Sequence, residues 1–246
     1  MALLHGTEYF ACLVLHELQI LAGVHPGYIS SSVVLLGNGI LFSVLMHIKG
    51  MSHSSLFHDT SHSVGATLGV LGPLVLLLVP GLLAAEMLLQ WGTLWLIPPD
   101  SQDASHFARL TERSPDMLLL TCVLAPILEE MLFRGIILRS FLQQYPARSA
   151  LIASALLFGA AHLNPYQFVT ASLMGYLSGW LYLRSRSLLP SIILHAGNNI
   201  GVSISIAMND GNRTWMDVAW FGFGGVVVAW AALRALHRLL ARSPAA

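Results

Sequence analysis

The sequence has 246 residues, of which 55% are hydrophobic and only 10% are charged, and its mean hydropathy is +0.69. A soluble domain carries roughly a quarter charged residues, so this chain lacks the polar side chains needed to cover a surface that faces water. Its net charge is zero, which gives no indication of a nucleic-acid partner. The composition therefore predicts an integral membrane protein, in contact with membrane lipid, and argues against a soluble one.

Apolar segments of a length that can cross a bilayer, roughly 17–25 residues, give eight candidate spans. Their approximate bounds are 3–24, 28–48, 64–88, 117–138, 149–163, 166–183, 188–208 and 218–240. The first is the weakest because it contains Glu8, His16 and Glu17, and the third contains Pro73 and Pro80, which are expected to kink it. We expect an all-α, polytopic membrane protein of about eight transmembrane helices. These helices would enclose a polar intramembrane chamber, within a single domain, 1–246, whose catalytic core covers about 117–208.

Lys and Arg residues in the loops predict the orientation, because they accumulate on the cytoplasmic side. With eight spans, both termini share one side with the even-numbered loops. The basic residues of that side are Lys49, Arg139, Arg148, Arg184, Arg186, Arg234, Arg238 and Arg242, against Arg109, Arg113 and Arg213 on the other. We therefore expect a multi-pass protein of the bacterial plasma membrane with both termini in the cytoplasm.

The fourth segment contains three ionisable residues in an otherwise apolar stretch: Glu129, Glu130 and Arg134. A charge in lipid costs several kcal/mol, so these residues are expected to have a structural or catalytic role that offsets this cost. Glu130 and Arg134 are four apart and share one face of a helix, which predicts an ion pair. Glu129 is rotated by about 100° from Glu130 and can remain free to act as a general base.

Two later segments carry further polar residues at helical spacing. The fifth ends in a stretch from Phe158 to His162, and the seventh places His195 and Asn199 on one face. Taken alone, each of these residues could simply form a hydrogen bond that holds two helices together. Because each is costly in lipid, convergence on one chamber is the simplest way to satisfy them together. Such a set can activate water by acid–base chemistry, and a His/Asn pair can stabilise an oxyanion.

The sequence indicates water as the nucleophile, because no Ser or Cys stands in a clear nucleophile motif. Cys12 and Cys122 both lie in apolar runs and are interpreted as small core residues. The loop with His47, His53, His58 and His62 could bind a metal, since His58 and His62 have helical ligand spacing. It has no recognisable metal motif, so we expect adventitious binding there and neither a metal nor another cofactor in the function. Glu86, His16 and Glu17 could line the chamber or could be interfacial or hydrogen-bonded to a neighbouring helix.

The three motifs, Glu129-Glu130-x-x-x-Arg134, Phe158-x-x-x-His162 and His195-x-x-x-Asn199, resemble those of the CPBP family of intramembrane glutamic endopeptidases, and they occur in the family's order. This family includes the CAAX prenyl endopeptidase and bacteriocin-processing relatives. The resemblance implies that Glu129 activates water together with His162, and that His195 and Asn199 form the oxyanion site. It also implies that Glu130 and Arg134, with Phe158, support the site.

The resulting prediction is a protease that cleaves a peptide bond in a membrane-anchored or hydrophobic protein or peptide. One alternative is a zinc protease with His162, His195 and a Glu as ligands. The other is a non-catalytic membrane protein, such as an immunity factor, a chaperone-like binder or a proton-coupled carrier.

Overall fold

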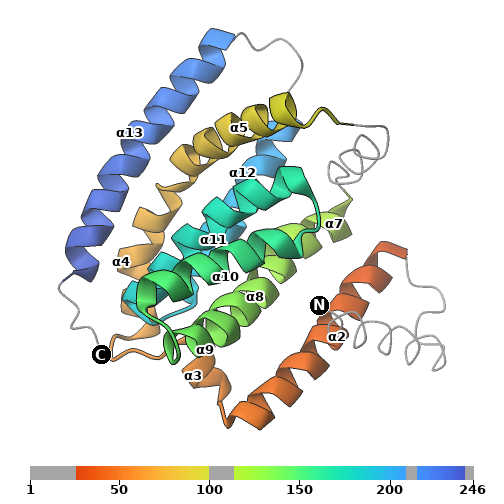
Figure 1. Ribbon diagram of the computed structural model, residues 1–246, viewed down its shortest axis with the longest axis vertical. Coiled ribbons are helices and arrows are strands. Elements are labelled where there is room, and N and C mark those ends of the chain that lie inside the picture. The colour runs from red at the N-terminus through yellow and green to blue at the C-terminus, as the bar shows by residue number, and fades with distance from the viewer. Residues whose placement is uncertain (1–25, 100–113, 209–214, 242–246) are drawn as a thin grey trace.

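The computed structural model describes residues 26–99, 114–208 and 215–241 (Figure 1). The protein is all-helical, as expected, with 85% of its structure in helices and no strands in the described ranges. The first candidate span, with His16, Glu17 and Cys12, lies outside the described residues, and so do Arg109, Arg113, Arg213 and Arg242.

The other seven candidate spans correspond to helices. The single helices are α2 Pro26–Lys49, α4 Val64–Leu76, α5 Val79–Leu96, α10 Ala147–Ala161, α11 Pro165–Ser185, α12 Leu189–Ala207 and α13 Trp215–Leu240. The fourth candidate span is a continuous helical run over 115–142 that is made of several short helices. The short helix α3 His53–Phe57 lies between α2 and α4. Capping residues fix several helix starts. Asn164 Oδ1, for example, accepts the backbone N–H groups of Tyr166 and Gln167 at 2.9 and 3.1 Å at the start of α11.

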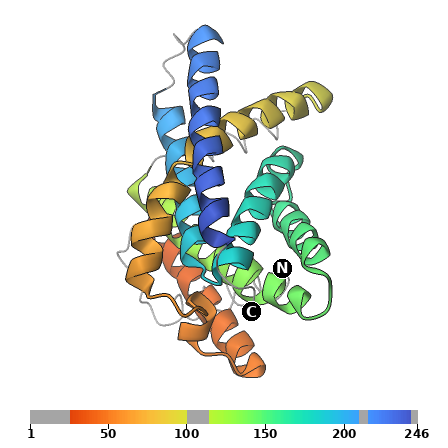
Figure 2. The same ribbon diagram turned by 90° about the vertical axis from the view of Figure 1, so that its left-hand side faces the viewer.

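The third candidate span is broken into α4 and α5, which are bent by 42° relative to each other. The break falls at Leu77 and Leu78, between Pro73 and Pro80, as the expected kinks required. Figure 2 shows the two helices running in different directions. The bend lets α5 pack on α11, α12 and α13 while α4 contacts α12 and α13.

The helical run that contains the two adjacent glutamates widens from α to π winding in two places. It comprises α7 Pro115–Leu119, the π-helix η1 Leu120–Leu124, α8 Ala125–Glu130, the π-helix η2 Met131–Leu138 and α9 Arg139–Leu142. In η1, the backbone N–H of Ala125 bonds to the carbonyl of Leu120, five residues back, immediately before Pro126. A proline clashes with the carbonyl four residues earlier, and the wider π turn accommodates it. Wide turns of this kind are frequent at functional sites.

Glycines bring α10, α11 and α12 close to their neighbours. A Cβ on Gly175 would lie 3.2 Å from Ala155 Cα, and one on Gly179 would lie 2.5 Å from Leu151 Cδ1. This glycine pair therefore lets α10 approach α11 closely. On α12, a Cβ on Gly201 would lie 2.8 Å from Leu83 Cδ1 of α5. These contacts fix the spacing of the helices that carry the candidate site.

The number of membrane spans stays a prediction. By length and apolarity alone, one helix of the described ranges qualifies as a span, over Gly222–Leu240 of α13, and the bent pair α4–α5 could form a second. Several other helices carry polar or charged side chains that contact one another across helices, as Glu130 and His195 do. These side chains lower the mean hydropathy of the helices that carry them.

At one end of the bundle lie loops that the distribution of Lys and Arg predicts to share one side of the membrane. Lys49 Nζ donates to Ser140 Oγ at 3.4 Å, and the Arg139 guanidinium donates to Asp59 Oδ2 at 3.1 Å. The backbone N–H of Asp59 in turn donates to the Arg186 carbonyl at 2.9 Å. The ends of α2, α9 and α11 therefore meet. Which side of the membrane they face stays a prediction.

The His-rich loop is held to the protein by His58. Its Nδ1 lies 2.9 Å from Ser187 Oγ and its Nε2 lies 2.6 Å from the His62 carbonyl oxygen. Within the described ranges, no three His, Cys, Asp or Glu side chains converge in a way that could hold a metal ion.

Candidate active site

Glu130 and Arg134 form the buried ion pair that their spacing predicts. Both side chains are 0% exposed, and Arg134 Nε lies 3.1 Å from Glu130 Oε2. The two atoms are not aligned for a hydrogen bond, so the contact is electrostatic. Arg134 also donates from a terminal nitrogen to the Gly175 carbonyl at 2.9 Å, and its guanidinium carbon lies 4.6 Å from the centre of the Phe158 ring. The pair thus ties η2 to α10 and α11.

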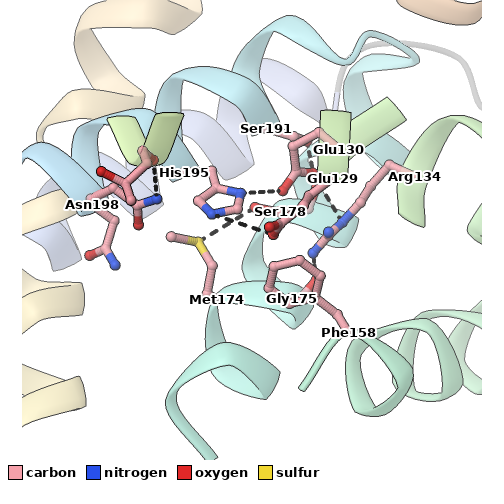
Figure 3. A network of polar contacts seen from close by, with 12 residues as sticks. Glu129, Glu130, Arg134, Phe158, Met174, Gly175, Ser178, Ser191, His195 and Asn198 are labelled. Atoms are coloured by element: carbon pink, nitrogen blue, oxygen red, sulfur yellow. Dashed lines mark hydrogen bonds and ion pairs between the residues drawn. The ribbon is translucent and has the colours of Figure 1, made fainter. Parts of the chain in front are cut away.

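The two ring nitrogens of His195 face the two glutamates (Figure 3). Its Nδ1 is 3.0 Å from Glu130 Oε1, and its Nε2 is 3.9 Å from Glu129 Oε2. A carboxylate only accepts hydrogen bonds, so Nδ1 carries a proton that it donates to Glu130. In the neutral ring Nε2 is then an acceptor, and it can donate only when His195 is doubly protonated.

The two glutamates differ in their surroundings. Glu130 is fully buried and contacts both Arg134 and His195. The Glu129 side chain is 35% exposed, and its Oε2 is buried with no hydrogen-bond partner in the described ranges. One carboxylate is therefore held on two sides, whereas its neighbour keeps acceptor capacity.

The Phe158 ring joins the two histidines. It makes edge-to-face contacts with His162 at 5.2 Å and with His195 at 5.7 Å between ring centres. His162 Nδ1 lies 3.0 Å from the Phe158 carbonyl oxygen, which can only accept. Nδ1 therefore holds the proton of a neutral His162, and Nε2 is left as an acceptor. His162 belongs to the same cluster as Glu129 without contacting it directly.

Asn199 is fixed to the π-helical turn before the glutamates. Its Nδ2 donates to the Thr121 carbonyl at 2.7 Å. The amide nitrogen has a second N–H, which this bond leaves available. The wider winding of η1 thus coincides with a contact that orients a candidate oxyanion donor.

The adjacent Asn198 makes a contact that the sequence reasoning missed. Its Nδ2 lies 3.2 and 3.1 Å from the two carboxylate oxygens of Glu86 on α5. Of the two alternatives for Glu86, hydrogen bonding to a neighbouring helix is confirmed. The available signal was the isolated acidic residue in an apolar segment, but sequence spacing alone could not identify its partner.

Two comparisons with known proteins found a match to membrane peptidases. The family model described as type II CAAX prenyl endopeptidase Rce1-like matches residues 112–201. The chain is also 23% identical over 166 residues to "Putative membrane peptidase YdiL" of Bacillus subtilis (strain 168). That match covers 67% of this chain and 66% of the relative, just under two thirds of the relative's length.

No solved structure matches the chain. The family match includes Glu129, Glu130, Arg134, His162, His195 and Asn199, so it covers the residues that form the cluster described above. Both matches support the resemblance to the CPBP/CAAX protease family that the three motifs carry.

Proposed function

We propose that the protein is an intramembrane glutamic-type endopeptidase that hydrolyses a peptide bond in a membrane-associated protein or peptide. The observation that carries this proposal is the difference between the two adjacent carboxylates. Glu130 is held by Arg134 and His195, whereas Glu129 Oε2 has no hydrogen-bond partner among the residues that the structure describes. A general base needs an available lone pair within reach of the water that gives up its proton. Glu129 Oε2 offers such a lone pair, next to His195.

In the proposed reaction, Glu129 accepts a proton from a water molecule while the water oxygen attacks the scissile carbonyl carbon. The carbonyl π electrons move to the oxygen, which becomes an oxyanion. His162 helps to hold the water through its acceptor Nε2. The intermediate then collapses, the C–N bond breaks, and the proton on Glu129 passes to the leaving amine.

The developing oxyanion needs donors that are already in position. Asn199 supplies the N–H that is not used by Thr121. His195 supplies Nε2–H when its ring is doubly protonated, with Nδ1–H held by Glu130. Arg134 pairs with Glu130 and holds it in place, and Phe158 packs on both histidines.

The proposed substrate is a protein or peptide with a hydrophobic or lipidated end. The composition predicts a membrane-embedded chain, and the matching family model is described as a prenyl endopeptidase. A substrate anchored in the bilayer would present its cleavable bond at a fixed depth. We place the chain as a multi-pass protein in the bacterial plasma membrane, and the loop charges support both termini in the cytoplasm.

Comparative proteomics of membrane fractions tests this function. Cells that produce the wild type are compared with cells that produce Glu129→Gln, and new protein termini are quantified. We expect at least one membrane protein to keep its uncut terminus in the variant. Equal sets of termini, together with an unchanged phenotype, would favour the non-catalytic alternative.

A second assay uses purified protein in lipid vesicles and a fluorescence-quenched peptide with a farnesylated cysteine near its C-terminus. The matched control peptide lacks the farnesyl group and thus tests whether an anchored end is needed. Cleavage that survives a strong zinc chelator supports the glutamate mechanism, and its loss would point to the zinc-protease alternative.

A further inference from the structure

The carbonyl group of Thr121 lacks both of the backbone donors that an α-turn or a π-turn would give it. In an α-turn it would accept from the N–H of Ala125, four residues later, but that N–H bonds to the Leu120 carbonyl instead. In a π-turn it would accept from residue 126, five residues later, which is a proline without an N–H. The carbonyl is therefore open to a donor from another helix.

Asn199 of α12 supplies that donor. Its Nδ2 donates to the Thr121 oxygen at 2.7 Å, at the short end of the usual range of about 2.7–3.2 Å for an N–H···O bond. A second contact joins the same two segments: Cys122 Sγ lies 3.7 Å from Ser203 Oγ, and this hydroxyl donates to the Asn199 carbonyl at 2.8 Å. The open carbonyl of η1 and the side chain of Asn199 thus meet in a register that a neighbouring contact supports.

The Thr121 carbonyl also decides which way round the Asn199 amide lies. A carbonyl oxygen only accepts hydrogen bonds, so the NH2 end of the amide must face it and Oδ1 must lie on the other side. The second N–H of the same nitrogen stays available. An amide turned the other way round would present an acceptor in place of that N–H, which would repel an oxyanion instead of stabilising it. The open carbonyl therefore selects the orientation that suits an oxyanion donor.

We propose that Pro126 is a positioning residue for Asn199, and that it acts by denying the Thr121 carbonyl a backbone donor. Pro126 is buried in α8 and acts through the helix rather than on the substrate. An alanine there would bring an N–H and would remove the clash that favours the wide turn. The backbone would then compete with Asn199 for the Thr121 oxygen. The catalytic meaning of this role rests on the proposed function, whereas the hydrogen bond itself can be measured without any substrate.

Solid-state NMR of the full chain in lipid vesicles measures this hydrogen bond as a distance. With ¹³C in the threonine carbonyls and ¹⁵N in the asparagine side chains, a dipolar coupling joins Thr121 to Asn199, and its loss in Asn199→Ala assigns it. In the wild type we expect this coupling, and its absence would overturn the proposal without any variant at position 126. In Pro126→Ala we expect the coupling to weaken or to disappear. A folded Pro126→Ala protein with an unchanged coupling would refute the positioning role.

Two further variants separate the missing donor from other effects of the substitution. N-methylalanine at position 126, introduced by cell-free translation, differs from alanine by one methyl group, which replaces the N–H and takes the place of the proline Cδ. It should keep the coupling, and a loss equal to that in Pro126→Ala would refute the proposed cause. Pro73→Ala removes a proline from the interior of α4, and it should leave the coupling between Thr121 and Asn199 unchanged.

Kinetics on the farnesylated peptide test the catalytic consequence. Pro126→Ala should lower kcat about 10- to 10²-fold and leave KM within about twofold, because a misplaced oxyanion donor acts in the transition state. In an Asn199→Ala background, the same substitution should lower kcat by less than about twofold, since the side chain that Pro126 positions is gone. Equal losses in both backgrounds would show a general structural effect and would refute the proposal, and so would an unchanged kcat in Pro126→Ala.

The outcomes separate this positioning role from the proposed function. If the wild type cleaves no peptide and Pro126→Ala still weakens the coupling between Thr121 and Asn199, the orientation of Asn199 by Pro126 stands and the proposed function fails. If Glu129→Gln abolishes cleavage while Pro126→Ala changes neither the coupling nor kcat, the function stands and this inference fails.

Discussion

Removing the carboxylate of Glu130 should destabilise the protein strongly, because it leaves Arg134 charged and fully buried. Both side chains are 0% exposed and 3.1 Å apart. In Glu130→Ala, the guanidinium keeps the Gly175 carbonyl and the Phe158 ring, neither of which carries a compensating charge. Breaking a buried pair by removing one partner costs about 3–5 kcal/mol. For a chain of this length that corresponds to a decrease in Tm of about 6–20 °C.

Asp59 and Arg139 provide a matched control. Their ion pair has the same 3.1 Å separation, but the side chains are 27% and 55% exposed for Arg139 and Asp59 respectively. Exposed pairs contribute about 0–1 kcal/mol, so Asp59→Ala should lower Tm by at most about 4 °C. The two pairs are alike in distance and charge and differ in burial, and Glu130 also accepts a hydrogen bond from His195.

Thermal unfolding in detergent, followed by circular dichroism, measures both variants. The double variant Glu130→Ala/Arg134→Met should recover a substantial part of the lost Tm, because it removes the stranded cation and fills its space. If Glu130→Ala unfolds within about 2 °C of the wild type, or if the double variant is no more stable than the single one, the assignment of this pair as the clamp of the site is wrong.

The remaining predictions concern turnover and packing. Glu129→Gln should lower kcat by at least about 10²-fold while Tm changes little, because Glu129 Oε2 makes no hydrogen bond in the described ranges; wild-type turnover on the quenched peptide would exclude Glu129 as the base. Asn199→Ala should lower kcat about 10²- to 10³-fold through loss of an oxyanion donor, and a change in KM alone would assign it to substrate binding instead. Gly175→Ala places a Cβ 3.2 Å from Ala155 Cα, and overpacking of this kind costs about 1–3 kcal/mol. We expect both Tm and activity to fall, because the substitution moves the carbonyl that Arg134 binds. An unchanged Tm would show that α10 and α11 can move apart at this contact without a loss of stability.

The relations within a single helix could be predicted from the sequence. Glu130 and Arg134 are four residues apart, and the helical period places them on one face whatever the rest of the fold does. The glycines at 175 and 179 share a face for the same reason, and proline at positions 73 and 80 restricts the local backbone whichever helix packs beside it. These features depend only on spacing along the chain, and all of them are present in the structure.

The relations between helices were decided by the tertiary structure. Asn198 and Asn199 are adjacent in sequence, yet one bonds to Glu86 and the other to the Thr121 carbonyl, because about 100° of helical rotation directs them to different neighbours. In the same way, the rotation and depth of α12 place His195 Nδ1 on Glu130 rather than on Glu129. The sequence by itself determined that glutamates, histidines and asparagines had to meet inside an apolar bundle, because none of them is stable alone in lipid. Which atom of each meets which partner depends on the register of several packed helices at once, and only the folded chain determines that register.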